Sequence, residues 1–256
     1  MNECVDKWKQ NGIIIRAPIN YRFNNPLTMA PKKDAFGNMT LKWPCLDPQH
    51  INKLLPDDYY PIPLIKDIFE ALAGAVIFTT LDLKSAYHQF LIKLEDQPKT
   101  AFTWHHEQLM FMGAPFGLKP MSSKFQWVTH LILRDLWFVL AYIDDIVIFS
   151  KYEDDHNLYV IEVIEWLTNA GLRLNLDKCH FFRRQIRLLG FIISPNGILL
   201  DPQKLINIDT WDSPTIAKQV MHYLGLFNYF RHHIPLISRL TVPLDVLWNS
   251  IDVLKD

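Results

Sequence analysis

The sequence has no long apolar run. None of its apolar stretches approaches the roughly 20 residues that a membrane-spanning helix needs, and residues 1–7 lack the apolar region of a secretory signal. These absences exclude the usual sequence features of membrane-anchored and secreted proteins. We therefore expect a soluble intracellular protein, in the cytoplasm or the nucleus, that makes no contact with a membrane.

Cysteine is also scarce. The three residues Cys4, Cys45 and Cys179 are odd in number and share no spacing typical of metal ligands. This pattern indicates reduced structural thiols. In contrast, the 256 residues include 49% hydrophobic residues, which is enough to bury a sizeable core. The chain is predicted to be globular.

The most informative motif is the tetrapeptide Tyr142-Ile143-Asp144-Asp145. Apolar residues precede it at 139–141 and follow it at 146–149, a pattern that predicts a strand, a tight turn and a second strand. The two acids therefore lie at the tip of a hairpin. Adjacent carboxylates repel each other, and a divalent metal ion is the natural cation to offset them. Taken alone, however, an acidic pair in a turn is more commonly a solvated loop.

A third acid strengthens the prediction of a metal site. Asp82 ends an apolar, β-branched segment at residues 76–81, which is typical of a buried central strand. If this strand lies beside the hairpin, three carboxylates converge, and such hard oxygen ligands suit Mg²⁺. Two ions about 3.5 to 4 Å apart activate an attacking hydroxyl and stabilise a leaving pyrophosphate oxygen. The predicted reaction class is phosphoryl transfer.

The periodicity around these strands predicts helices. One begins at Pro63 and is stopped by Gly74, a second begins near residue 120, and a third runs from Asp154 or Asp155 to Gly171. This order predicts an α+β fold with the acids on one sheet, backed by helices. After residues 194–197 the pattern changes to helices only, which indicates a separate small helical subdomain.

Five motifs follow one another along the chain, at residues 81–89, 100–102, 115–118, 142–145 and 189–191. In this order they resemble the motif series of reverse transcriptases, most nearly those of gypsy-type (Ty3-like) retrotransposons with long terminal repeats. The resemblance extends from about residue 11 to residue 247. It implies a right-hand polymerase with an antiparallel palm sheet backed by helices, interleaved fingers and a small helical thumb. Fingers and palm would occupy residues 1–195 and the thumb residues 196–256, without the ribonuclease H domain that usually follows.

The resemblance also implies roles for individual residues. Asp82, Asp144 and Asp145 would be the catalytic metal ligands, together with the backbone carbonyl of Leu83, for two Mg²⁺ ions that Mn²⁺ can replace. Tyr87 would lie beneath the sugar of the incoming nucleotide and exclude a 2′-hydroxyl, unless it is simply a core tyrosine. The other nucleotide-binding positions would be the backbone amides of Ser85 and Ala86, the pocket residues Phe116 and Gly117, and the basic fingertips Lys32 and Lys33.

The remaining positions concern the nucleic acid, because the implied substrates are dNTPs and an RNA or DNA template with its primer. Template and primer contacts would come from Gln126, Tyr142, Leu188, Leu189 and Gly190, of which the last three match the primer grip. An apolar strand edge explains the primer-grip residues almost as well. A solvated charged turn is likewise the alternative for Lys32 and Lys33.

Several positions depart from the family pattern. Trp43 and Gln49 stand where the fingers normally present arginines to the triphosphate, and residues 120–124 differ from the usual start of the helix behind the pocket. We therefore expect a weak polymerase. Two other hypotheses remain open: a degenerate nucleic-acid-binding protein with this fold, and a structural or interaction module.

The net charge does not decide among these hypotheses. With a formal charge of −1, the chain as a whole has no excess of the Lys and Arg residues that contact phosphates. Residues 178–239 nevertheless contain eight Lys or Arg against three acids. This local excess is consistent with a nucleic-acid surface, or with a solvated basic face that has no ligand.

Overall fold

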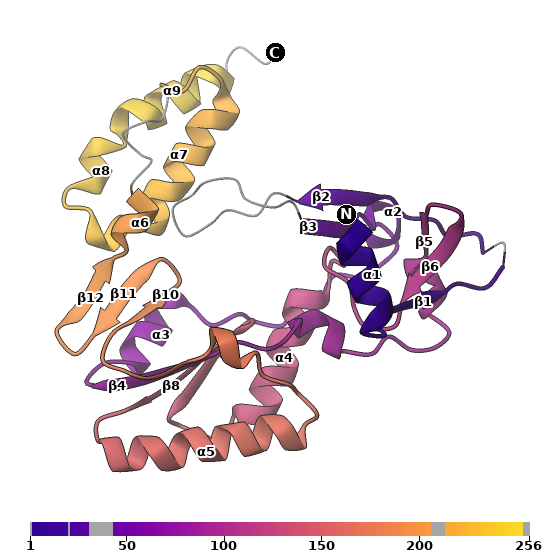
Figure 1. The fold of residues 1–256 in the computed structure, drawn as a ribbon. Helices are drawn as coiled ribbons and strands as arrows, with labels where there is room; N and C mark the ends of the chain where they lie inside the picture. Colours follow the sequence, from indigo (N-terminus) through magenta and orange to yellow (C-terminus); the bar gives the residue numbers. More distant parts are fainter. Residues whose placement is uncertain (1, 20, 31–42, 206–212, 253–256) are drawn as a thin grey trace. The chain divides into compact units, whose positions relative to one another are not determined.

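The computed structural model describes the chain except for residues 1, 20, 31–42, 206–212 and 253–256 (Figure 1). It divides into two compact units. Leaving the undescribed residues aside, the larger unit comprises residues 1–34, 38–186 and 194–197, and the smaller one residues 187–193 and 198–256. Within the described ranges, no helix has both the length and the apolar composition needed to cross a bilayer. The boundary at residue 195 between palm and thumb stays a prediction.

A four-stranded antiparallel sheet forms the centre of the larger unit. Its strand order is β7 (Val139–Tyr142), β8 (Asp145–Ser150), β4 (Ile77–Leu81) and β9 (His180–Arg183). The two central strands, β4 and β8, are almost continuously apolar and β-branched, as expected for strands covered on both faces. The predicted hairpin around the acidic pair is confirmed as β7 and β8.

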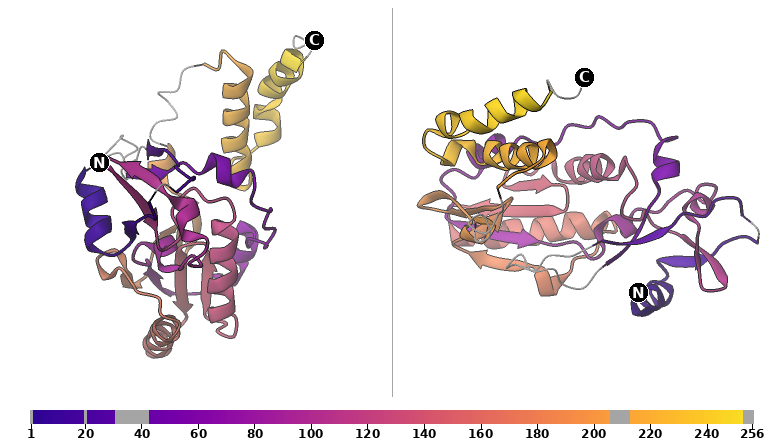
Figure 2. Two further views of the ribbon diagram at one scale, coloured as in Figure 1. Left: turned by 90° about the vertical axis from the view of Figure 1, so that its right-hand side faces the viewer. Right: turned by 90° about the horizontal axis from the view of Figure 1, so that it is seen from above.

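Two helices pack against this sheet, α4 (Met121–Leu133) and α5 (Glu153–Asn169) (Figures 1 and 2). Their buried residues share one core with Leu81 of β4 and Ile146 and Ile148 of β8. Three acids in the first turn of α5 complement the helix dipole. The helix predicted after Pro63 is α3 (Ile65–Ala71), which begins two residues later than the proline. The helices predicted from the sequence are therefore present.

The rest of the larger unit has its own core. A three-stranded sheet, β1 (Ile14–Arg16), β6 (Glu107–Phe111) and β5 (Phe102–Trp104), packs against helix α1 (Asn2–Gln10) through residues such as Trp8, Phe102 and Phe111. The segment after β1 forms an antiparallel pair of strands, β2 (Leu27–Ala30) and β3 (Trp43–Leu46). The short helix α2 (Gln49–Asn52) follows this pair. Two 3₁₀ turns, η1 (Ala86–Gln89) and η2 (Gln97–Thr100), connect β4 to β5, and a third, η3 (Leu176–Lys178), precedes β9.

The smaller unit is not purely helical. It contains most residues of the sheet β10 (Ile186–Leu188), β11 (Phe191–Ser194) and β12 (Gly197–Leu200). It continues with α6 (Pro202–Leu205), α7 (Ala217–Tyr229), the 3₁₀ turn η5 (Arg231–His233), α8 (Ile237–Leu240) and α9 (Val242–Asp252). Phe191 of β11 contacts the rings of Tyr229 and Phe230. The strands therefore belong to the core of this unit.

His156 connects α5 to the central sheet. It is fully buried, and its two ring nitrogens lie 2.8 Å from Thr79 Oγ1 and 2.9 Å from Ser150 Oγ. Burial lowers the pKa of His156, and burial also lowers the pKa of His88, which stacks on Phe111, to about 4. Both imidazoles are therefore neutral in the folded protein near pH 7.

We predict that acid destabilises the larger unit partly through His156. The unfolded chain takes up a proton at this residue near pH 6.5, whereas the folded chain resists it. The contribution of neutral His156 to the free energy of unfolding is thus complete above pH 6.5. It is lost as the pH falls toward the lowered pKa that His156 has in the folded protein. His156→Gln keeps a donor and an acceptor but does not titrate. The difference in Tm between wild type and His156→Gln should shrink from pH 7.5 to pH 5, and a constant difference would contradict this.

Candidate active site

The register of β4 and β8 brings two of the predicted catalytic acids together. The last pair of the ladder joins Leu81 and Ile146, so the position just beyond it sets Asp82 opposite Asp145. Residues directly opposite in an antiparallel pair have Cα atoms roughly 4.5 to 5.5 Å apart. Because side chains alternate along a strand, both acids fall on the face opposite to the helix-packed Leu81 and Ile146. Asp145 is exposed by its surface area, although the protein around its carboxylate removes part of the water that would solvate the charge.

A strained two-residue turn carries the third acid. Tyr142 pairs with Asp145, which leaves Ile143 and Asp144 as the turn between β7 and β8. Ile143 has a φ of 54°, which is a rare conformation for a β-branched residue. Such strain persists only where the surrounding structure enforces it, and it is concentrated at functional sites.

The residue that holds this turn is Gln126 of α4. Its Oε1 accepts a hydrogen bond from the Ile143 N–H at 2.6 Å, and its Nε2 donates to the Ala141 carbonyl at 2.9 Å. The side chain is only 2% exposed. The amide of Gln126 is thus buried and used by the hairpin, and its expected contact with the template stays a prediction.

The three acids influence one another electrostatically. Burial, together with the charges of Asp144 and Asp82, raises the pKa of Asp145 to about 6. The cation nearest to Asp82 among the ion pairs of the described residues is Lys178, whose Nζ lies 3.7 Å from Asp82 Oδ2. Both side chains are well exposed, so this pair contributes little to stability. The cluster thus retains an unfavourable concentration of negative charge.

A divalent cation fits this donor set chemically, because the ligands are hard carboxylate oxygens whose mutual repulsion a cation relieves. In the described ranges, however, no three His, Cys, Asp or Glu side chains are already oriented around one common ion position. The carboxylates would therefore have to rotate, or backbone oxygens and water would have to complete the shell. The predicted metal role of Asp82, Leu83, Asp144 and Asp145 remains a prediction.

Tyr87 lies beside the acids in an aromatic pocket. Its ring centroid is 4.9 Å from that of Phe116 and 5.4 Å from that of Phe125, and its hydroxyl lies 3.2 Å from Ser122 Oγ. Burial, with a further contribution from the charge of Asp144, raises the pKa of Tyr87. The half-buried tyrosine is therefore neutral and close to Asp144.

The loop at Gly117 requires glycine for two reasons. Gly117 has a φ of 101°, and a Cβ there would lie 2.7 Å from the Leu46 carbonyl oxygen. Asn52 holds this loop at both ends, since its Nδ2 donates to the Gly117 carbonyl at 2.8 Å and its Oδ1 accepts from Lys119 N–H at 2.9 Å. Sequence reasoning missed Asn52, because a lone asparagine outside every motif carries no signal of a distant partner.

Comparison with known proteins identifies the family. A family model described as reverse transcriptase (RNA-dependent DNA polymerase) matches residues 30–193. The chain belongs to the reverse transcriptase family. Its curated relatives include the retrovirus-related Pol polyproteins from the Drosophila melanogaster transposons opus, 36% identical over 96% of the chain, and gypsy, 35% identical over 96%. The chain spans only about a quarter of the length of these relatives, at 25% and 24%. The predicted gypsy-type family is confirmed.

Solved structures agree with this assignment. The foamy viral protease-reverse transcriptase in complex with double-stranded DNA has a TM-score of 0.87 and 26% identity, over 97% of this chain and 43% of that one. The same viral protein in complex with an RNA/DNA hybrid has a TM-score of 0.81 and 26% identity, over 96% and 32%. The likeness confirms the predicted α+β polymerase fold.

The other residues predicted to bind the nucleotide are only partly described. Ser85, with a φ of 51°, immediately precedes η1, in which Ala86 is the first residue. Lys32 and Lys33 lie outside the described residues. Gln49, one of the departures from the family, lies at the start of α2 and donates from Nε2 to Asp47 Oδ2 at 3.2 Å. Trp43 pairs with Ala30 in the ladder between β2 and β3.

The predicted primer-grip residues fall in the smaller unit. Leu189 and Gly190 form the turn between β10 and β11 with φ values of 51° and 83°, as a tight hairpin requires. The Leu189 carbonyl accepts a hydrogen bond from the Tyr229 hydroxyl at 2.7 Å. Leu188 is buried, so its side chain packs inside this unit. Their contact with a primer stays a prediction.

We predict that Gln126→Leu destabilises the fold. The substitution roughly keeps the volume but leaves the Ile143 N–H and the Ala141 carbonyl without their partner, which costs about 2 kcal/mol for groups of this kind. Denaturant unfolding monitored by circular dichroism measures the effect. The control Leu131→Ala, on the exposed face of the same helix, should change stability by less than about 0.5 kcal/mol. Equal effects of the two variants would show that the hydrogen bonds of Gln126 contribute nothing.

Proposed function

We propose that this chain is the polymerase core of an RNA-directed DNA polymerase, which extends a primer on an RNA or DNA template by two-metal nucleotidyl transfer. The observation that carries the proposal is the juxtaposition of Asp82 and Asp145 across β4 and β8, with Asp144 in the adjoining turn. In a member of the reverse transcriptase family, three acids at the adjoining ends of the two central strands are best explained as the catalytic carboxylates.

In this proposal Asp82 and Asp144 are the principal ligands of two Mg²⁺ ions, with Asp145 and the Leu83 carbonyl as further donors. When bound, the ions supply charge stabilisation to the attacking and leaving oxygens of the phosphoryl transfer. The protein itself fixes the positions of the acids. Gln126 holds the turn of Asp144 in its strained conformation, and the last ladder pair, Leu81 with Ile146, sets Asp82 beside Asp145 just beyond the ladder. A preorganised site of this kind needs little rearrangement during the reaction.

Tyr87 would form the floor of the nucleotide pocket. Its ring contacts the rings of Phe116 and Phe125, and its hydroxyl lies within hydrogen-bond distance of Ser122. A ring restrained in this way cannot easily move aside for an additional oxygen on the sugar. Tyr87 is therefore proposed to select deoxyribonucleotides over ribonucleotides, with dNTPs as the substrates.

The proposed macromolecular partner is a primer paired with an RNA or DNA template. The foamy viral relatives were solved with double-stranded DNA and with an RNA/DNA hybrid, which supports the same class of partner here. A second candidate function is duplex binding with weak or no polymerisation. It is favoured by Gln49, which stands at an expected arginine position and is hydrogen-bonded to Asp47.

Primer extension with the Asp→Asn variants tests the proposal. We predict that Asp144→Asn or Asp145→Asn lowers extension at least a thousandfold, because an amide is a poor ligand for the cation, while duplex affinity stays equal or increases slightly as a negative charge is removed. The assay uses purified chain, a homopolymer template with its primer, dNTPs and Mg²⁺ or Mn²⁺. Glu162→Gln on α5 is a charge-matched control.

The outcomes separate the two candidate functions. A wild-type chain that binds duplex in a salt-dependent manner but extends no primer would support the second candidate. Variants that extend at the wild-type rate would overturn the assignment of the acids. Failure of the wild type to bind any duplex would exclude both candidates.

We predict that Tyr87→Ala admits ribonucleotides, because it removes the ring that occupies the space a 2′-hydroxyl needs. The ratio of kcat/KM for dGTP to kcat/KM for GTP should fall by at least tenfold. Tyr87→Phe keeps the ring and removes only the bond to Ser122, so it should retain most of the discrimination. An unchanged ratio in the alanine variant would mean that Tyr87 only packs.

A further inference from the structure

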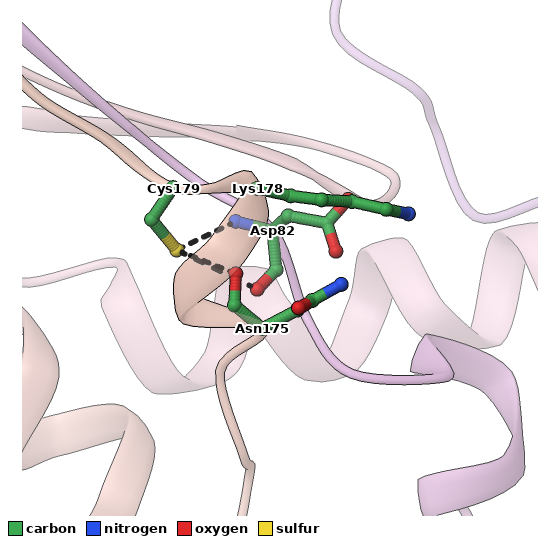
Figure 3. A network of polar contacts seen from close by, with 4 residues as sticks. All are labelled: Asp82, Asn175, Lys178 and Cys179. Carbon is green, nitrogen blue, oxygen red and sulfur yellow. Dashed lines mark hydrogen bonds and ion pairs between the residues drawn. The ribbon is translucent and has the colours of Figure 1, made fainter.

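The backbone at Asp82 is enclosed by a turn from a distant part of the sequence. Asp82 comes one residue after the end of β4, so the strand ladder no longer includes it. The segment from Asn175 to Cys179, which contains η3, lies directly against it (Figure 3). The turn therefore bonds to the backbone of Asp82 in the way that strand β9 pairs with the preceding residues of β4.

Two hydrogen bonds connect the turn to this one residue, and a third lies within the turn. The Asn175 N–H donates to the Asp82 carbonyl at 2.8 Å. The Asp82 N–H donates to Cys179 Sγ at 3.4 Å, and the thiol donates in turn to the Asn175 carbonyl at 3.3 Å. The two peptide groups that flank the Asp82 Cα are thus both bonded to the turn. Cys179 is buried, so water does not compete for these bonds.

Lys178 acts on a different part of Asp82. Its ammonium group reaches the carboxylate from the same turn (Figure 3), but the ion pair is exposed. A cation that binds the carboxylate can displace an exposed ammonium at low cost. The buried thiol, in contrast, restrains the backbone whether or not the carboxylate has a ligand.

We propose that Cys179 is a positioning residue, which fixes the backbone of Asp82 so that its carboxylate is presented to the cation cluster. The proposal rests on the metal-dependent function proposed above. It assigns to the thiol a task that its packing does not require, since an apolar side chain of similar size would fill the same space. Partners that orient metal ligands typically change metal affinity or activity by about 10- to 100-fold when removed.

Two substitutions distinguish positioning from packing. Cys179→Val keeps the apolar volume and removes both hydrogen bonds, whereas Cys179→Ser keeps a donor and an acceptor in a smaller side chain. If Cys179 positions Asp82, the serine variant should be closer to wild type than the valine variant. If Cys179 only fills the core, the order should be reversed. Cys4→Ser in α1 is the matched control and should behave as wild type.

The first measurement is Mn²⁺ affinity of the full chain by electron paramagnetic resonance, without template or nucleotide. We expect the valine variant to bind Mn²⁺ about tenfold more weakly than wild type and the serine variant less than threefold more weakly. In primer extension, the valine variant should lose about tenfold in kcat with a change in KM for dNTP of less than twofold. Melting curves identify folded variants; if valine does not fold, Cys179→Ala replaces it in the same comparison.

The outcomes are separable from those of the proposed function. Valine and serine variants with equal Mn²⁺ affinity, or a valine variant that binds more tightly than serine, overturn the positioning role. A chain that shows the expected order of Mn²⁺ affinities but extends no primer refutes the polymerase function and leaves the positioning role in place.

Discussion

The site depends on one constraint, the antiparallel register between β4 and β8. Pairing Leu81 with Ile146 sets Asp82 opposite Asp145. If one of these strands slipped by one residue, its side chains would change faces and its acid would turn into the helix-packed core. The apolar residues of β4 and β8 that pack against α4 and α5 prevent that shift. The same burial that stabilises the sheet therefore determines where the negative charge collects.

Holding like charges together has an energetic cost, which appears as the raised pKa of Asp145. The fold counters this cost with neutral hydrogen bonds to the backbone. Gln126 binds the chain on the side where it enters the turn that carries Asp144, and the Asn175–Cys179 segment binds both peptide groups of Asp82. Each device restrains the main chain and leaves the carboxylates themselves accessible to a cation.

The two halves of the site also differ in what supports them. The acidic turn is held from α4, one of the helices that form the core, so its geometry is coupled to the packing of the larger unit. Asp82 is held by a short turn before the edge strand β9, which is covered on fewer sides. The geometry of Asp82 is thus more sensitive to local substitution than that of Asp144.

The family, the fold class and the strand–turn–strand around Asp144 and Asp145 could be predicted from the sequence, because ordered motifs and apolar periodicity are local properties of the chain. It also indicated helices α3, α4 and α5 to within a few residues. It could not reveal that Gln126 is buried against the hairpin, that Asn52 holds the Gly117 loop, or that Cys179 bonds to Asp82. These contacts join residues 17 to 97 positions apart, and no local pattern records them. Only the tertiary structure decided them, since the partner of a polar side chain is selected by which distant segments the core brings together.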